Sequence, residues 1–230
     1  MSSRPCPDGP LRGSRLQLRS YLVGHRTDFD EYLQSFLHGA GARYSRLDWV
    51  SPVDSTNFAE YRDGDALRQL GLGHLEQALR GFWPDNGPCW DALAVARSAV
   101  VPDHPGIILL EAKSHRLEMC GSGCGATAMK SKQKIDAALL LTQRWLSARP
   151  RVPWTSHLYQ YANRLAHLYF LRFVAEPTVD AWLVNVYFTQ DSYRSTSKEQ
   201  WDDFLPEVKW ALGLDQPPPF TLDAFLPAIA

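Results

Sequence analysis

The octapeptide GIILLEAK at residues 106–113 predicts a strand that ends in two charged side chains. Its four consecutive aliphatic residues, 107–110, are typical of a strand buried on both faces. Glu111 and Lys113 follow two residues apart, so in an extended chain both point to the same face, about 7 Å apart. Buried charge is costly unless it is paired or bound to a metal ion. The end of this strand is therefore the first candidate for a functional site.

A third charged residue, Asp91, lies on a strand predicted just before this one, at residues 90–96. In that strand Asp91, Leu93 and Val95 share one face. If the two strands pair as a hairpin, Asp91 approaches Glu111 across the ladder. Neighbouring carboxylates repel each other, and a divalent cation between them removes that penalty. Because carboxylate oxygens are hard ligands, the pair suits Mg²⁺ or Mn²⁺.

The rest of the chain predicts one α/β domain with a central mixed β-sheet flanked by helices. Helical spacing predicts helices at about 15–37, 66–83, 126–148, 156–174 and 199–212, and apolar runs predict strands near 47–50 and at 180–189. The last segment, after three prolines, is predicted to be an apolar turn. Residues 1–13, rich in Pro, Gly, Ser and Arg, are expected to be a disordered leader, and residues 14–230 a single domain.

Asp91, a Glu-x-Lys motif twenty residues later and the flanking helices resemble the PD-(D/E)xK nuclease superfamily. This is the fold of many restriction and repair endonucleases. The resemblance covers residues 66–189 and implies a restriction-endonuclease-like core. Pro84-Asp85 also spells the PD dipeptide, but it lies in a predicted turn and is a poorer candidate than Asp91.

The resemblance implies a metal-dependent nuclease that hydrolyses phosphodiester bonds, with an endonuclease favoured over an exonuclease. Asp91 and Glu111 would hold Mg²⁺ or Mn²⁺, with the backbone carbonyl of Ala112 as a further ligand. Lys113 would orient the attacking water or help to deprotonate it. Similar nucleases often supply another carboxylate from the preceding helix, which makes Glu76 an additional candidate ligand. A solvated helix charge is an equally good explanation of Glu76.

The helix predicted at 156–174 carries a polar face within one arc, formed by Gln160, Asn163, Arg164 and His167. A polar face on an otherwise apolar helix indicates that it lines a polar cavity. Some members of the superfamily carry a glutamine on this helix, so Gln160 is expected to complete the site, with Arg164 on a substrate phosphate. A plain solvated face is the alternative.

Positive charge is concentrated in one part of the chain. The net charge is −1, but residues 111–151 hold eight Lys and Arg against three acids. The overall balance argues against a protein that coats nucleic acid through bulk charge. Within the basic segment, Lys130 and Lys134 open a predicted helix and are candidates for phosphate contacts. A charge run of this kind is also explained by a solvated face.

The expected compartment follows from two features that the sequence lacks, and the expected partner follows from the resemblance. No stretch approaches the ~20 apolar residues of a membrane span, and no signal peptide is visible, so we expect a cytoplasmic protein. The four cysteines are expected to be reduced thiols. Nucleic acid, with DNA favoured, is the expected partner, and a homodimer is compatible with the sequence. The alternative is a non-catalytic nucleic-acid or protein-binding module that retains the nuclease fold, and metal binding discriminates between the two.

Overall fold

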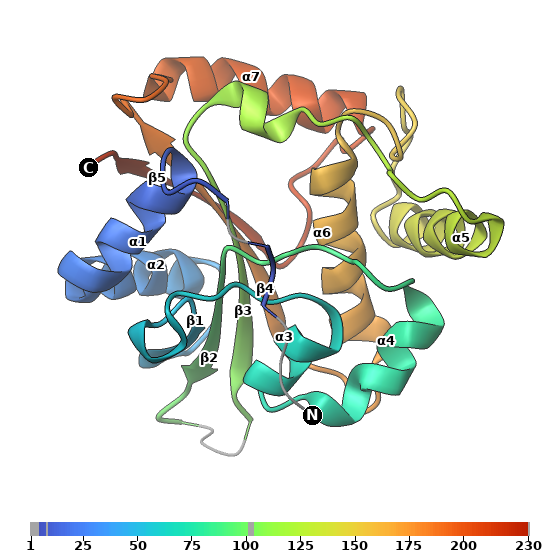
Figure 1. Cartoon of the computed structure of the whole chain (residues 1–230), viewed down its shortest axis with the longest axis horizontal. Coiled ribbons are helices and arrows are strands. Elements are labelled where there is room, and N and C mark those ends of the chain that lie inside the picture. Colours follow the sequence, from blue (N-terminus) through green and yellow to red (C-terminus); the bar gives the residue numbers. More distant parts are fainter. Residues whose placement is uncertain (1–4, 8, 101–103, 230) are drawn as a thin grey trace.

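The computed structural model describes residues 5–7, 9–100 and 104–229, and its centre is a five-stranded mixed β-sheet (Figure 1). The strands are β1 (Arg46–Ser51), β2 (Ala92–Arg97), β3 (Gly106–Lys113), β4 (Ala181–Thr189) and β5 (Thr221–Pro227). They lie in the order β1-β2-β3-β4-β5; β1 to β3 are antiparallel, and β3, β4 and β5 run parallel. The predicted α/β class with a central mixed sheet is confirmed.

Helices cover both faces of this sheet (Figure 1). The α-helices are α1 (Ser14–Gly24), α2 (Arg26–Gly39), α3 (Asp63–Gln69), α4 (Glu76–Phe82), α5 (Met129–Trp145), α6 (Tyr159–Tyr169) and α7 (Lys198–Ala211). Short helical turns are η1 (Asp54–Thr56), η2 (Gly73–Leu75), η3 (Arg116–Met119) and η4 (Phe170–Val174), the last a π-helical continuation of α6. Helices α1 and α2 pack on one face, and α3 to α7 pack on the other.

The side chains of β3 alternate between the two faces of the sheet, so this one strand contributes to both hydrophobic cores. Ile107 and Leu109 belong to the cluster on the α6 side, whereas Ile108, Leu110 and Ala112 belong to the cluster under α1 and α2. Successive side chains of a strand point to opposite faces, so Glu111 continues the row of Ile107 and Leu109. The strand is buried on both faces, as predicted, and its charged end faces α6.

Two elements differ from the sequence prediction. The helix expected at 66–83 is divided into α3, η2 and α4, because Gly71 adopts a left-handed conformation (φ +76°) that ends the first helix. The expected terminal turn is instead β5, which pairs in parallel with β4. The sequence did not reveal β5, because three prolines precede it and because strand formation there depends on pairing with the edge of β4. Residues 101–103, part of the loop between β2 and β3, lie outside the described residues.

The N-terminal segment is tied to the body of the fold. Cys6 forms a disulfide with Cys89, 83 residues away, and its backbone N–H donates to the Glu60 carbonyl at 2.8 Å. The expectation of reduced thiols is therefore wrong for this pair, because sequence spacing does not show which distant cysteines folding brings together. Cys120 and Cys124 are free thiols. Of the segment expected to be a disordered leader, residues 5–7 and 9–13 have described positions, and residues 1–4 and 8 lie outside the described residues.

Across the described part of the chain, no helix combines the length and the apolar character that crossing a bilayer requires.

Candidate active site

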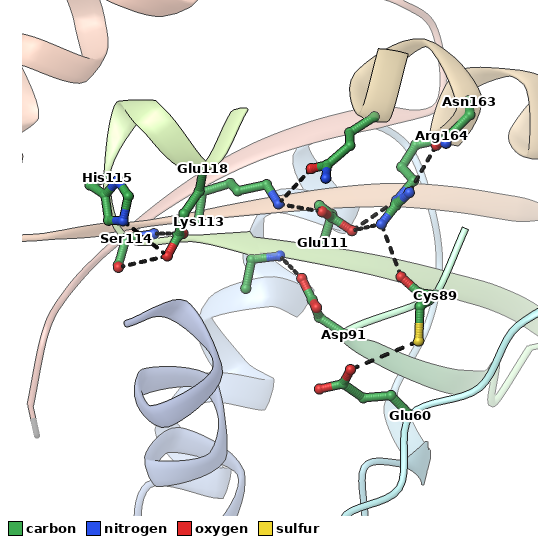
Figure 2. A network of polar contacts seen from close by, with 12 residues as sticks. Glu60, Cys89, Asp91, Glu111, Lys113, Ser114, His115, Glu118, Asn163 and Arg164 are labelled. Carbon is green, nitrogen blue, oxygen red and sulfur yellow. Dashed lines mark hydrogen bonds and ion pairs between the residues drawn. The ribbon is translucent and has the colours of Figure 1, made fainter. Parts of the chain in front are cut away.

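The hairpin of β2 and β3 brings Asp91 to the end of β3, close to Glu111 and Lys113 (Figure 2). Ala92 pairs with Leu110, so Asp91, one residue before β2, is opposite Glu111. The sequence predicted Asp91 inside the strand; instead it lies just outside, after Trp90, which forms an isolated bridge with Tyr61. Oδ2 of Asp91 accepts a hydrogen bond from the Ala112 backbone N–H at 2.7 Å.

Glu111 is the centre of a buried cluster of charges. Its Oε1 lies 2.6 Å from Nζ of Lys113, and its Oε2 accepts from Nε of Arg164 at 2.8 Å and lies 2.6 Å from Nη2 of the same guanidinium. The side chains of Glu111 and Arg164 are 8% and 9% exposed. Burial alone would raise the pKa of Glu111, but the charges of Arg164 and Lys113 outweigh it and hold that pKa below its usual value. Glu111 is therefore ionised at neutral pH.

The charges of this cluster raise the pKa values of both Lys113 and Asp91, with different consequences for the two groups. Burial opposes the charge of Lys113, but Glu111 and Asp91 outweigh it and raise the pKa of Lys113 above its usual value. Burial, together with the charge of Glu111, raises the pKa of Asp91 to about 8. Lys113 thus stays protonated at neutral pH, whereas Asp91 is costly to ionise unless a further positive charge comes close to it.

Helix α6 supplies the roof of the site. Asn163, Arg164 and His167 are all buried, so the polar face predicted for this helix is directed inward rather than into solvent. Arg164 also donates to Oδ1 of Asn163 at 2.8 Å and to the Cys89 carbonyl at 2.9 Å. The structure therefore pairs Arg164 with Glu111, and its expected contact with a substrate phosphate stays a prediction. Gln160 is exposed at the edge of the site, where its Oε1 lies 3.4 Å from Nζ of Lys113.

Two of the predicted residues, Glu76 and Lys134, are engaged elsewhere, and a third, Lys130, is exposed. Glu76 forms ion pairs with Arg68 and, at 2.7 Å, with Arg80, which agrees with the reading of Glu76 as a helix charge. Lys134 donates to the Arg80 carbonyl at 2.6 Å. Lys130 is exposed in the first turn of α5. Glu76 and Lys134 are thus held at α4, and the structure does not bring them to Glu111.

A cavity of about 220 Å³ opens beside Asp91, and several residues that line it were not identified as site candidates from the sequence. Its walls include Arg15 and Arg19 of α1, and Phe58 and Glu60 from the connection between β1 and α3. Glu60 forms an ion pair with Arg15 at 3.1 Å, and the Arg19 guanidinium lies 3.7 Å from the centre of the Phe58 ring. These residues carry no motif, and only folding brings them near residue 91.

On the α6 side a much smaller cavity, about 10 Å³, adjoins Glu111 and Lys113, and Met119 of η3 is among the residues that line it. A cavity of this size holds about one water molecule.

The donor set near Asp91 fits a hard divalent cation. Among the described residues no group of three or more His, Cys, Asp or Glu side chains could hold a metal ion. A cation here would therefore rest on two carboxylates, Asp91 and Glu111, completed by main-chain and water oxygens. Mg²⁺ is commonly bound in this way, through one or two carboxylates while it retains several waters. Glu111 would have to share oxygens already engaged by Arg164 and Lys113.

No protein-family model, no curated protein and no solved structure matches this chain.

Proposed function

We propose that this protein is a Mg²⁺- or Mn²⁺-dependent nuclease that hydrolyses phosphodiester bonds, with a core related to the PD-(D/E)xK superfamily. The observation that carries the proposal is the convergence of Asp91, Glu111 and Lys113 at one end of the β2–β3 hairpin, under α6. Asp91 opens onto the larger cavity, whereas Glu111 and Lys113 line the small cavity on the α6 side. The proximity of these three groups supports the proposal, because the motif needs two carboxylates and a lysine close together.

Each residue has a distinct part in the proposed reaction. Asp91 and Glu111, with the Ala112 carbonyl, would hold the cation, which when bound supplies Lewis-acid polarisation of a phosphoryl oxygen and a water of lowered pKa. The raised pKa of Lys113 favours a role as a charged hydrogen-bond donor, which orients the attacking water or offsets charge on the phosphate. Deprotonation of water by Lys113 is the less favoured of its two expected roles.

Arg164 and Gln160 support these groups. Arg164 contacts Oε2 of Glu111 through two nitrogens, so it fixes the orientation of that carboxylate. Gln160 lies against Lys113 at the exposed edge of the site, which supports a role for Gln160 in substrate binding. Asn163 acts indirectly, because its side chain accepts from Arg164.

The finer parts of the proposal rest on the resemblance. DNA is favoured over RNA and endonucleolytic cleavage over exonucleolytic cleavage, and a homodimer is compatible with the proposal. A cytoplasmic location is also proposed. The Cys6–Cys89 disulfide speaks against this location, because reducing compartments disfavour such bonds.

One observation favours a second function, a binding module that retains the fold without catalysis. Lys113 and Arg164 together engage both carboxylate oxygens of Glu111. A closed ion-pair cluster of this kind can be maintained for structure alone, without a metal ion.

The test is isothermal titration of Mg²⁺ and Mn²⁺ into the wild type and into Asp91→Asn and Glu111→Gln, two changes that keep side-chain shape. Glu76→Gln is the matched control, because it removes a carboxylate outside the site. We expect binding in the wild type and in the control and none in the two site variants. Cleavage of plasmid DNA, single-stranded DNA and RNA with Mn²⁺ should follow the same pattern. If no metal binds, or if all four proteins bind it equally, the nuclease proposal is wrong and the binding module is the better explanation.

A further inference from the structure

A third hollow, of about 390 Å³, is lined by Arg116 and Leu117 of η3 and by Cys120, which follows η3. Met119 helps to line the small cavity beside Glu111 and Lys113, and the next residue, Cys120, lines this hollow. The segment of η3 is therefore a shared wall between the two. A ligand in the hollow would lie next to the candidate active site and remain outside it.

Basic and hydroxyl side chains share the lining of the hollow with Leu117, Cys120 and Phe204. His115 and Arg116 follow the end of β3, and Arg194, Ser195 and Thr196 come from the connection between β4 and α7. Among the described residues that line it, none carries a carboxylate. These groups are hydrogen-bond donors around a space with net positive charge, so an anion is the ligand that they fit.

The carboxylate of Glu118 in η3 pairs with Ser114 and His115 rather than with Arg116 or Arg194. The Oε2 of Glu118 accepts from the Ser114 backbone N–H at 2.7 Å, and its Oε1 lies 3.4 Å from Nε2 of His115. Glu118 thus holds the turn after β3 together, and its charge is directed toward Ser114 and His115. Arg116 and Arg194 are both exposed.

Aromatic rings accompany the arginines at the rim of the hollow. Tyr193, 41% exposed, has the guanidinium of Arg12 at 4.8 Å and that of Arg194 at 5.7 Å from its ring centre. The Arg116 guanidinium lies 6.0 Å from the Phe204 ring. A guanidinium that stacks by its face keeps its N–H edge available for phosphate oxygens. An exposed ring among such arginines offers a surface on which a base stacks.

We propose that this basic–aromatic surface, formed by Arg12, His115, Arg116, Tyr193 and Arg194, binds the phosphate backbone of a single-stranded nucleic acid. Single strands fit better than duplex because stacking on Tyr193 requires an unpaired base. The inference rests on the proposed function in one respect, that the bound strand is the substrate of the adjacent site. Binding itself needs neither the metal nor cleavage.

The experiment is fluorescence anisotropy with labelled probes of about 15 nucleotides, in EDTA so that no cleavage occurs. The probes are single-stranded DNA, single-stranded RNA and duplex DNA of one sequence. The test variant is Arg116→Ala with Arg194→Ala, and the matched control is Arg144→Ala with Arg149→Ala, which changes two exposed arginines that do not line the hollow. We expect single strands to bind roughly tenfold or more weakly to the test variant. The slope of log affinity against log salt should fall by about 1.4, since each lost phosphate contact contributes about 0.7 for single strands.

The outcomes separate this inference from the proposed function. Three results would each overturn the proposal that this surface binds a single strand. They are equal affinity of the wild type and the test variant, a preference for duplex DNA, and no binding of any probe. If the wild type binds Mn²⁺ and cleaves, and the test variant binds and cleaves equally well, only the surface proposal fails. If no metal binds but the test variant loses affinity for single strands, the surface stands and the nuclease proposal fails. Tyr193→Ala provides a second test, with weaker binding expected at unchanged salt slope.

Discussion

The carboxylate of Asp91 and the backbone N–H of Ala112 are joined by a 2.7 Å hydrogen bond that links the start of β2 to the end of β3. The bond holds Asp91 beside the strand from which Glu111 and Lys113 project. Asp91 is thus placed by a main-chain contact that does not depend on a ligand. Its carboxylate is kept in a partly buried position where ionisation is costly.

Asp91 should make the protein less stable as pH rises. Burial and the charge of Glu111 raise the pKa of Asp91 from 3.8 to about 8, so the folded state holds a proton that the unfolded chain releases. Its contribution to stability is full below about pH 4 and is lost between pH 4 and 8. We expect Asp91→Asn to flatten the fall in Tm across this range, measured by thermal unfolding in EDTA. The exposed Asp54→Asn should keep the wild-type slope, and an unchanged slope in Asp91→Asn would contradict the prediction.

His167 should act in the opposite direction. It is enclosed by α6 and by the rings of Trp83 and Trp90, with ring centres 4.9 and 6.2 Å away. Burial lowers the pKa of His167 from 6.5 to about 4. The folded state therefore holds the neutral ring, and stability is full above about pH 6.5 and falls as pH decreases toward 4, by about 3 kcal/mol. His167→Gln should lose this acid-side dependence in urea unfolding at pH 4 to 7. A variant as acid-sensitive as the wild type would argue against a buried neutral histidine.

Arg164 should be essential for stability because of the charge that it neutralises. Arg164→Met leaves Glu111 buried with Lys113 as its remaining cationic partner, and breaking a buried ion pair costs about 3–5 kcal/mol. Urea unfolding at pH 7 measures this loss. Arg144→Met, at an exposed position, should change stability by less than about 0.5 kcal/mol.

A double mutant shows whether the cost comes from Glu111. Adding Glu111→Gln to Arg164→Met removes the negative charge that Arg164 neutralises, so the double mutant should be more stable than the sum of the two single changes predicts. Strict additivity would mean that Arg164 acts through Asn163 or the Cys89 carbonyl instead.

The Cys6–Cys89 disulfide should lower the number of reactive thiols and raise the free energy of unfolding. Alkylation of the unfolded, unreduced protein should modify Cys120 and Cys124 only, and reduction should expose two further thiols. Cys6→Ser is expected to lower the free energy of unfolding by about 2–4 kcal/mol, because the unfolded chain loses a long closed loop. Cys120→Ser is the control, since its thiol is exposed and free. Four reactive thiols in the untreated protein would contradict the bond.

The sequence by itself determined the strand that ends in Glu111 and Lys113 and the two faces of that strand. Runs of apolar residues and their alternation act over a few neighbouring residues, so they can be read directly from the chain. Helical spacing also predicted the polar face of α6, but only the structure shows that this face is directed inward.

Only the tertiary structure decided which distant groups meet. Arg164 pairs with Glu111 across 53 residues, and Cys6 reaches Cys89 across 83. Glu60 joins the cavity beside Asp91, whereas Glu76, on the helix where a ligand was expected, is held by Arg68 and Arg80. The physical reason is that such contacts arise from the packing of whole elements, whose relative positions no local pattern specifies. The strand β5 shows the same dependence, because its backbone pairing is completed by the edge of β4.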